Sequence, residues 1–140
     1  MIRLVLAVLV TSMVAGCTNQ RVVAPESAGR SSSARPPVVS AETLCRDTFA
    51  NGTVLGWTAA DVGELRAYHY SGPAAHFPLR SAFAGIPATQ QGAWCWVRQG
   101  PGSGSLWGAV PGASPQRAIT VTGPGEDRFR GEMNRAPVMP

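Results

Sequence analysis

The stretch AWCWVR, residues 93–98, decides the fold of this chain. Cys95 stands between two tryptophans, so small and large side chains alternate along it. In an extended strand, residues two apart point to the same side. Trp94, Trp96 and Arg98 therefore share one face, while Cys95 points to the other. This period of two predicts a strand with large side chains on one face.

Two further strands are expected after this stretch. Residues 106–110 and 117–121 are short runs rich in apolar and β-branched residues, and turn-forming residues bound them. The segment over 100–104 reads GPGSG, which is a turn-rich connector. Because short connectors favour antiparallel neighbours, the sequence predicts a three-stranded antiparallel sheet.

A helix is expected before the sheet, over residues 40–50. Ser40 is a candidate N-cap, and Glu42 lies in the first turn, where a negative charge is favourable. Asn51-Gly52 then ends the helix. The alternative is a hairpin, because Asn-Gly is also a strong two-residue turn signal, but the helical spacing favours the helix. The residues on the shared helical face are Ala41, Leu44, Cys45, Thr48 and Phe49.

A second helix is expected after Trp57, with Thr58 as its N-cap and Asp61 in the place of the capping-box acid. It would end near Tyr70, before Gly72-Pro73. Residues 73–91 are punctuated by prolines and are predicted to form a long loop. The expected fold is therefore α+β, with two helices packed on a small three-stranded antiparallel sheet.

The amino-terminal residues 1–17 read MIRLVLAVLVTSMVAGC. Arg3 precedes the apolar run Leu4 to Val10, which is too short to span a bilayer and is typical of a signal peptide. The end of this stretch, Val14-Ala15-Gly16-Cys17, resembles the lipobox of bacterial lipoproteins. The resemblance implies a diacylglyceride on the sulfur of Cys17, cleavage before that residue, and anchoring at the extracytoplasmic face of the cell membrane. The alternative is an ordinary secreted protein with an unmodified Cys17.

The composition divides the rest of the chain. Residues 1–16 are expected to be the signal peptide, and residues 17–39 a disordered tether, because they offer few apolar side chains to bury. Residues 40–122 would form the folded domain. Residues 123–140 resemble the tether in composition and are predicted to be a disordered tail.

The number of cysteines predicts a disulfide bond. With Cys17 taken by lipid, Cys45 and Cys95 remain as an even pair in an oxidising compartment. We expect a disulfide between them that joins the first helix to the first strand. A redox role is the alternative, but catalytic thiols usually sit closer together, as Cys-x-x-Cys.

Several function classes find no support in the sequence. All twelve basic residues are arginines, and they are spread singly rather than gathered, so no nucleic-acid partner is expected. His69 and His76 have no acidic cluster nearby, so neither a metal nor another cofactor is expected. Ser71, His69 and Asp61 could form a hydrolytic trio, but no nucleophile motif accompanies them, so no catalytic residue is assigned.

The aromatic residues carry the binding hypothesis. Trp94, Trp96 and Trp107 lie on or near neighbouring predicted strands. If a helix covers the sheet face that carries these tryptophans, they belong to the core and Cys95 faces a second layer. If that face is exposed, it is an apolar platform for a partner. The candidate binding face also includes Arg98, together with three residues at or near the start of the long loop, namely His69, Tyr70 and His76.

These observations favour a lipid-anchored envelope protein with a small, non-catalytic binding domain. Its partner besides the membrane would be an envelope protein, a glycan or a small ligand. Two alternatives stay open: an enzyme that acts on envelope material, and a structural surface lipoprotein without a specific ligand.

Overall fold

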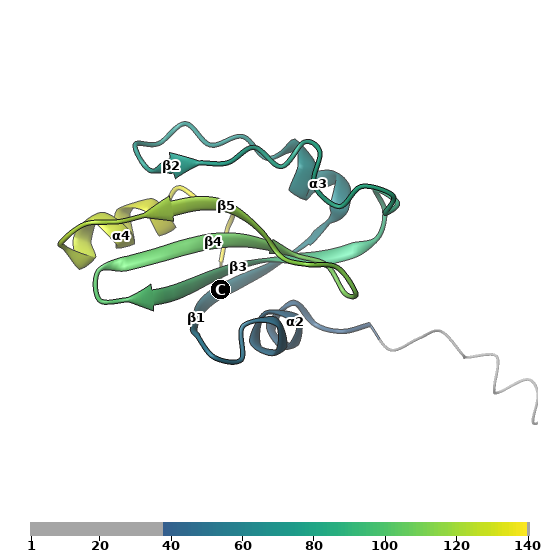
Figure 1. Cartoon of the computed structure of the whole chain (residues 1–140), viewed down its shortest axis with the longest axis horizontal. Coiled ribbons are helices and arrows are strands. Elements are labelled where there is room, and N and C mark those ends of the chain that lie inside the picture. The colour runs from purple at the N-terminus through teal and green to yellow at the C-terminus, as the bar shows by residue number, and fades with distance from the viewer. Residues whose placement is uncertain (1–37, 140) are drawn as a thin grey trace, which may run out of the picture. The chain divides into compact units, whose positions relative to one another are not determined.

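The computed structural model describes residues 38–139 (Figure 1). The expected signal peptide, the lipobox with Cys17, and the expected tether up to residue 37 lie outside these residues. From Val39 onward the described chain belongs to one compact unit.

The core of this unit is one five-stranded antiparallel sheet. Along the chain its strands are β1 (Thr53–Asp61), β2 (Ala75–His76), β3 (Gln91–Gly100), β4 (Ser103–Ala109) and β5 (Gln116–Val121). In space they are ordered β1-β3-β4-β5-β2. The three predicted strands are present as β3, β4 and β5, but the prediction of a three-stranded sheet with two helices is wrong. The structure has two more strands and, in the part that it describes, three helices.

Helix α2 (Ala41–Thr48) confirms the helix predicted after Ser40. The backbone N–H of Thr43 donates to the side-chain oxygen of Ser40, which is therefore the N-cap. The helix ends at Phe49, and Asn51-Gly52 lies in the turn that leads into β1. The hairpin alternative is thus excluded, and the Asn-Gly pair connects a helix to a strand.

The second predicted helix is corrected in both type and position. Residues 53–61 form strand β1, which pairs along its length with β3. Helix α3 (Val62–Ala67) starts only afterwards, with Asp61 as its N-cap and Glu64 completing a reciprocal capping box. A capping box is present, but its N-cap is Asp61, three residues after the expected N-cap Thr58. The β-branched and aromatic residues before Asp61 favour a strand, and pairing with the edge of β3 stabilises the strand over the expected helix.

The carboxyl-terminal tail is also corrected. Residues 126–133 form helix α4 (Glu126–Met133), where a disordered tail was expected. Phe129 and Glu132 on this helix are only 3% and 2% exposed. The helix is held by a contact distant in sequence, because the ring of Phe129 fills the space that a side chain at Gly104 would occupy.

The sheet is covered on both faces. Helix α2 packs on one face, and α3 and α4 pack on the other (Figure 1). Cys45 in α2 is bonded to Cys95 in β3, with their Cα atoms 5.6 Å apart, so the predicted disulfide and its placement are confirmed. Within residues 38–139, no helix is long and apolar enough to cross a membrane.

Candidate functional site

The alternation around Cys95 is present in the structure, and both of its faces are buried. Trp94 is 3% exposed and Trp96 is fully buried. The ring of Tyr68 lies 4.7 Å from that of Trp94, and the ring of Phe129 lies 5.2 Å from that of Trp96. These two tryptophans are therefore core, and neither is an accessible anchor.

Trp107 lies on the opposite face of the sheet. It pairs with Cys95 across the β3–β4 ladder, so both side chains point toward α2. Its ring lies 5.4 Å from that of Phe49, and the guanidinium of Arg117 lies 5.6 Å from the ring. The three tryptophans of the predicted binding face therefore do not form one surface.

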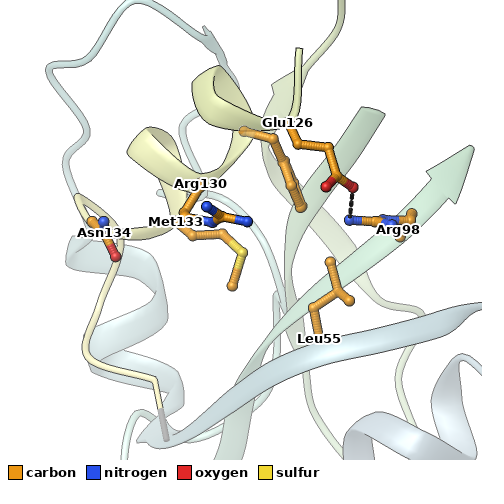
Figure 2. A pocket seen from close by; sticks show the side chains of 7 residues that line it. Leu55, Arg98, Glu126, Arg130, Met133 and Asn134 are labelled. Atoms are coloured by element: carbon orange, nitrogen blue, oxygen red, sulfur yellow. Dashed lines mark ion pairs between the residues drawn. The ribbon is translucent and has the colours of Figure 1, made fainter. Parts of the chain in front are cut away.

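Arg98, on the Trp96 face, opens onto a cavity of about 230 Å³ (Figure 2). We call it the α4 pocket, because α4 supplies four of its lining residues, while β1 and β3 supply one each. Its lining residues are Leu55, Arg98, Glu126, Phe129, Arg130, Met133 and Asn134.

The apolar wall of the α4 pocket comes from two elements. Phe129 and Met133 are four residues apart on α4, so they project from the same side of the helix. Leu55 belongs to β1, where the register with β3 shifts between Val54 and Gly56. A bulge of this kind redirects one side chain out of the regular alternation. It leaves Leu55 facing the helix across the pocket (Figure 2).

The other wall is charged. Nη2 of Arg98 lies 2.7 Å from Oε1 of Glu126, and this ion pair joins β3 to the first turn of α4. The Arg98 guanidinium also lies 5.8 Å from the ring of Phe129, and its buried Nε has no hydrogen-bond partner among the described residues. Arg130 reaches Asp127 only at 4.0 Å, and its guanidinium faces that of Arg98 across the pocket (Figure 2).

A second hollow, of about 500 Å³, gathers the other predicted residues. It is lined by Ser71 and its neighbours His69 and Tyr70, with Arg135 from the end of the chain. His76 lies beside it, with its ring 6.0 Å from that of His69 and 5.9 Å from that of Tyr70. The structure therefore brings these predicted residues together, but it places Arg98 at the α4 pocket instead.

Buried polar groups lie near this second hollow. Glu132 is almost fully buried; one carboxylate oxygen lies 3.2 Å from Arg135, and the other has no partner among the described residues. Burial, and secondarily the charge of Glu132, raises the pKa of Tyr68 to about 12. Burial and the neighbouring His69 lower the pKa of His76, which favours its neutral form. In the described part of the chain, no three His, Cys, Asp or Glu side chains are grouped to hold a metal ion.

The α4 residues of the pocket are absent from the sequence-based site. A local signal exists, because Phe129 and Met133 have helical spacing and Glu126 and Asp127 suit a first turn. The prediction of a disordered tail over residues 123–140 rested on composition instead of this helical spacing. Comparisons with known proteins supply no further guide: the chain matches no protein-family model, no curated protein and no solved structure.

Proposed function

We propose that this chain is an exported lipoprotein, anchored by lipid on Cys17 at the extracytoplasmic face of the cell membrane, whose folded unit binds a ligand without catalysing a reaction. Binding takes place in the α4 pocket. The observation that carries the proposal is the Arg98–Glu126 ion pair, which stands at the edge of an apolar cavity.

The anchoring part rests on the sequence and on the disulfide. The lipobox-like stretch ending at Cys17 supplies the only cysteine outside the bonded pair. A disulfide between Cys45 and Cys95 suits a protein that folds outside the reducing cytoplasm. The two observations are independent, and both favour export.

The binding part rests on the composition of the pocket. Ligand sites combine apolar walls with a few polar groups that fix orientation. Leu55, Phe129 and Met133 supply the apolar wall, and Arg98 and Arg130 supply donors. The lining holds no serine, cysteine or histidine, and its one carboxylate, Glu126, is held in the ion pair with Arg98. This lining favours binding over hydrolysis.

Anchoring is tested by intact mass and by fractionation. We expect the processed wild type to begin at Cys17, to carry the added mass of acyl chains, and to sediment with membranes. Cys17→Ser should leave the protein unprocessed or release it from membranes, because no other sulfur lies at the cleavage site. A wild-type protein with an unmodified Cys17 contradicts the anchor.

Binding is tested with three six-carbon probes of different charge: hexanol, hexanoate and hexylamine. The processed full-length protein in phosphatidylcholine nanodiscs is titrated by calorimetry, with empty nanodiscs as blank. We expect at least one probe to bind, and Leu55→Trp to abolish binding by filling the pocket. Val138→Trp is the matched control, because Val138 is 86% exposed and lies outside the lining. If no probe binds, or if Leu55→Trp changes nothing, the α4 pocket is not the ligand site.

A further inference from the structure

We propose that the ligand of the α4 pocket is a small carboxylate with a short apolar group, bound as an anion between Arg98 and Arg130. The inference rests on the proposed function, because it takes this pocket as the binding site. It adds the charge, size and orientation of the ligand.

The charge follows from the lining. Two guanidinium groups face the pocket, while Glu126 supplies the only carboxylate among its lining residues. The partner of Arg130, Asp127, lies outside the lining, is fully solvent-exposed and stays 4.0 Å away. Two arginines and one glutamate give the lining of the pocket a formal charge of +1, which a single anionic group on a ligand would balance.

The geometry at Arg98 favours a carboxylate. Its Nη2 is engaged by Glu126, while its Nε–H has no acceptor. A guanidinium binds a carboxylate best through two parallel N–H groups, and Nε and one Nη form such an edge. Glu126 uses only one N–H group of this edge, and the Nε–H is buried while Glu126 is in place. A carboxylate that displaces Glu126 would take over Nη2 and could pair with Nε–H as a second donor.

The orientation follows from the apolar wall. Leu55 and Met133 lie beside the guanidinium groups and oppose one another in Figure 2. A ligand that places its carboxylate between the arginines therefore directs its apolar part onto these two side chains and the ring of Phe129. A volume of about 230 Å³ holds roughly eight non-hydrogen atoms, at ~30 Å³ for each water-sized group. Hexanoate has this size.

Two sources of such a carboxylate are distinguished by a fourth probe. Hexanoate represents a fatty-acyl fragment, and N-acetylalanine, which is of similar size, represents the carboxyl terminus of a peptide with a small apolar last residue. Tighter binding of hexanoate identifies an acyl source, and tighter binding of N-acetylalanine identifies a peptide source. Either result supports the inference, provided that the carboxylate itself is required.

The carboxylate requirement is tested in the same nanodisc titration. We expect hexanoate to bind about tenfold more tightly than hexanol, and hexylamine not to bind. Arg98→Gln combined with Arg130→Gln should reduce hexanoate to the affinity of hexanol. Arg128→Gln is the matched control, because Arg128 is an exposed arginine of the same helix outside the pocket lining.

The affinity of Glu126→Gln for hexanoate shows whether the Arg98–Glu126 ion pair affects ligand binding or only holds α4 in place. The substitution removes the carboxylate that competes for Arg98, so hexanoate should bind several-fold more tightly even though α4 loses an anchor. Equal affinities for hexanol and hexanoate, with both lost in Leu55→Trp, would overturn the carboxylate inference and leave the pocket as a ligand site. Absence of binding by every probe would overturn both.

Discussion

The ring of Phe129 stands edge-on to the indole of Trp96, with centroids 5.2 Å apart and planes at 83°. This contact joins α4 to β3, which lies between β1 and β4 in the sheet. It also forms the boundary between the protein core and the α4 pocket, since Trp96 is core and Phe129 lines the pocket. The stability of the core and the shape of the pocket therefore depend on the same ring.

Replacement of that ring should be costly. Phe129→Ala removes a side chain that is 3% exposed, and we expect a loss of about 3–5 kcal/mol in the free energy of unfolding. Urea denaturation followed by tryptophan fluorescence measures it. Phe77→Ala is the control, because Phe77 is 40% exposed, and it should cost about 1 kcal/mol or less. Equal effects of the two variants would mean that α4 is not packed on the sheet.

Alanine substitutions at two glycines should change stability in opposite directions. Gly104→Ala places a Cβ inside the volume of the Phe129 ring, and overpacking of this kind costs about 1–3 kcal/mol. Gly131→Ala lies in α4 with nothing near its Cβ position, so a better helix former there should raise stability by roughly 0.5–1 kcal/mol. The midpoint of urea unfolding should be lower than that of the wild type for Gly104→Ala and higher for Gly131→Ala. A neutral Gly104→Ala would contradict the packing of Phe129 above β4.

The disulfide should contribute a large share of the stability. Cys45 and Cys95 are 50 residues apart in sequence, and the chain-entropy model gives roughly 4 kcal/mol for closing a loop of that length. We expect Cys45→Ala combined with Cys95→Ala to unfold at clearly lower urea concentration than the wild type. Reductant should lower the midpoint of the wild type to a similar value and leave that of the double variant unchanged.

Stability should also fall at high pH. The pKa of Tyr68 is about 12 in the folded protein and about 10 in an unfolded chain. Between these values the unfolded state has lost the phenolic proton that the folded state keeps, so stability decreases as pH rises through this window. Ultraviolet absorbance of the phenolate should show one tyrosine ionising near pH 12. The step should vanish in Tyr68→Phe and persist in Tyr70→Phe.

The sequence predicted elements whose cause is local. Alternation about Cys95 predicted β3, and short connectors predicted its neighbours β4 and β5. Ser40 marked the start of α2, and an even pair of cysteines predicted the bond to β3. In each case the decisive residues lie within a few positions of one another, or have no other partner.

The errors have non-local causes. The strand over 53–61 depends on the free edge of β3, about forty positions later, so local capping signals led to a helix instead. Helix α4 depends on the space above Gly104. The residues of the candidate site divide in the same way into local and non-local cases. Local alternation with Trp94 and Trp96 identified Arg98 from the sequence. Leu55 enters the pocket only through the bulge in β1, and Phe129 only because α4 forms, and neither feature was predicted.

The position of the disulfide also determines how the chain responds to tension. A pull on the amino-terminal side of α2 reaches Cys45 and crosses its sulfur directly to Cys95 in β3. Strand β1, helix α3 and the loop after them lie between the two cysteines in sequence and carry no load while the bond is intact. An anchored molecule would therefore transmit force into its central strands, and single-molecule unfolding should release an extra 50-residue length only after reduction.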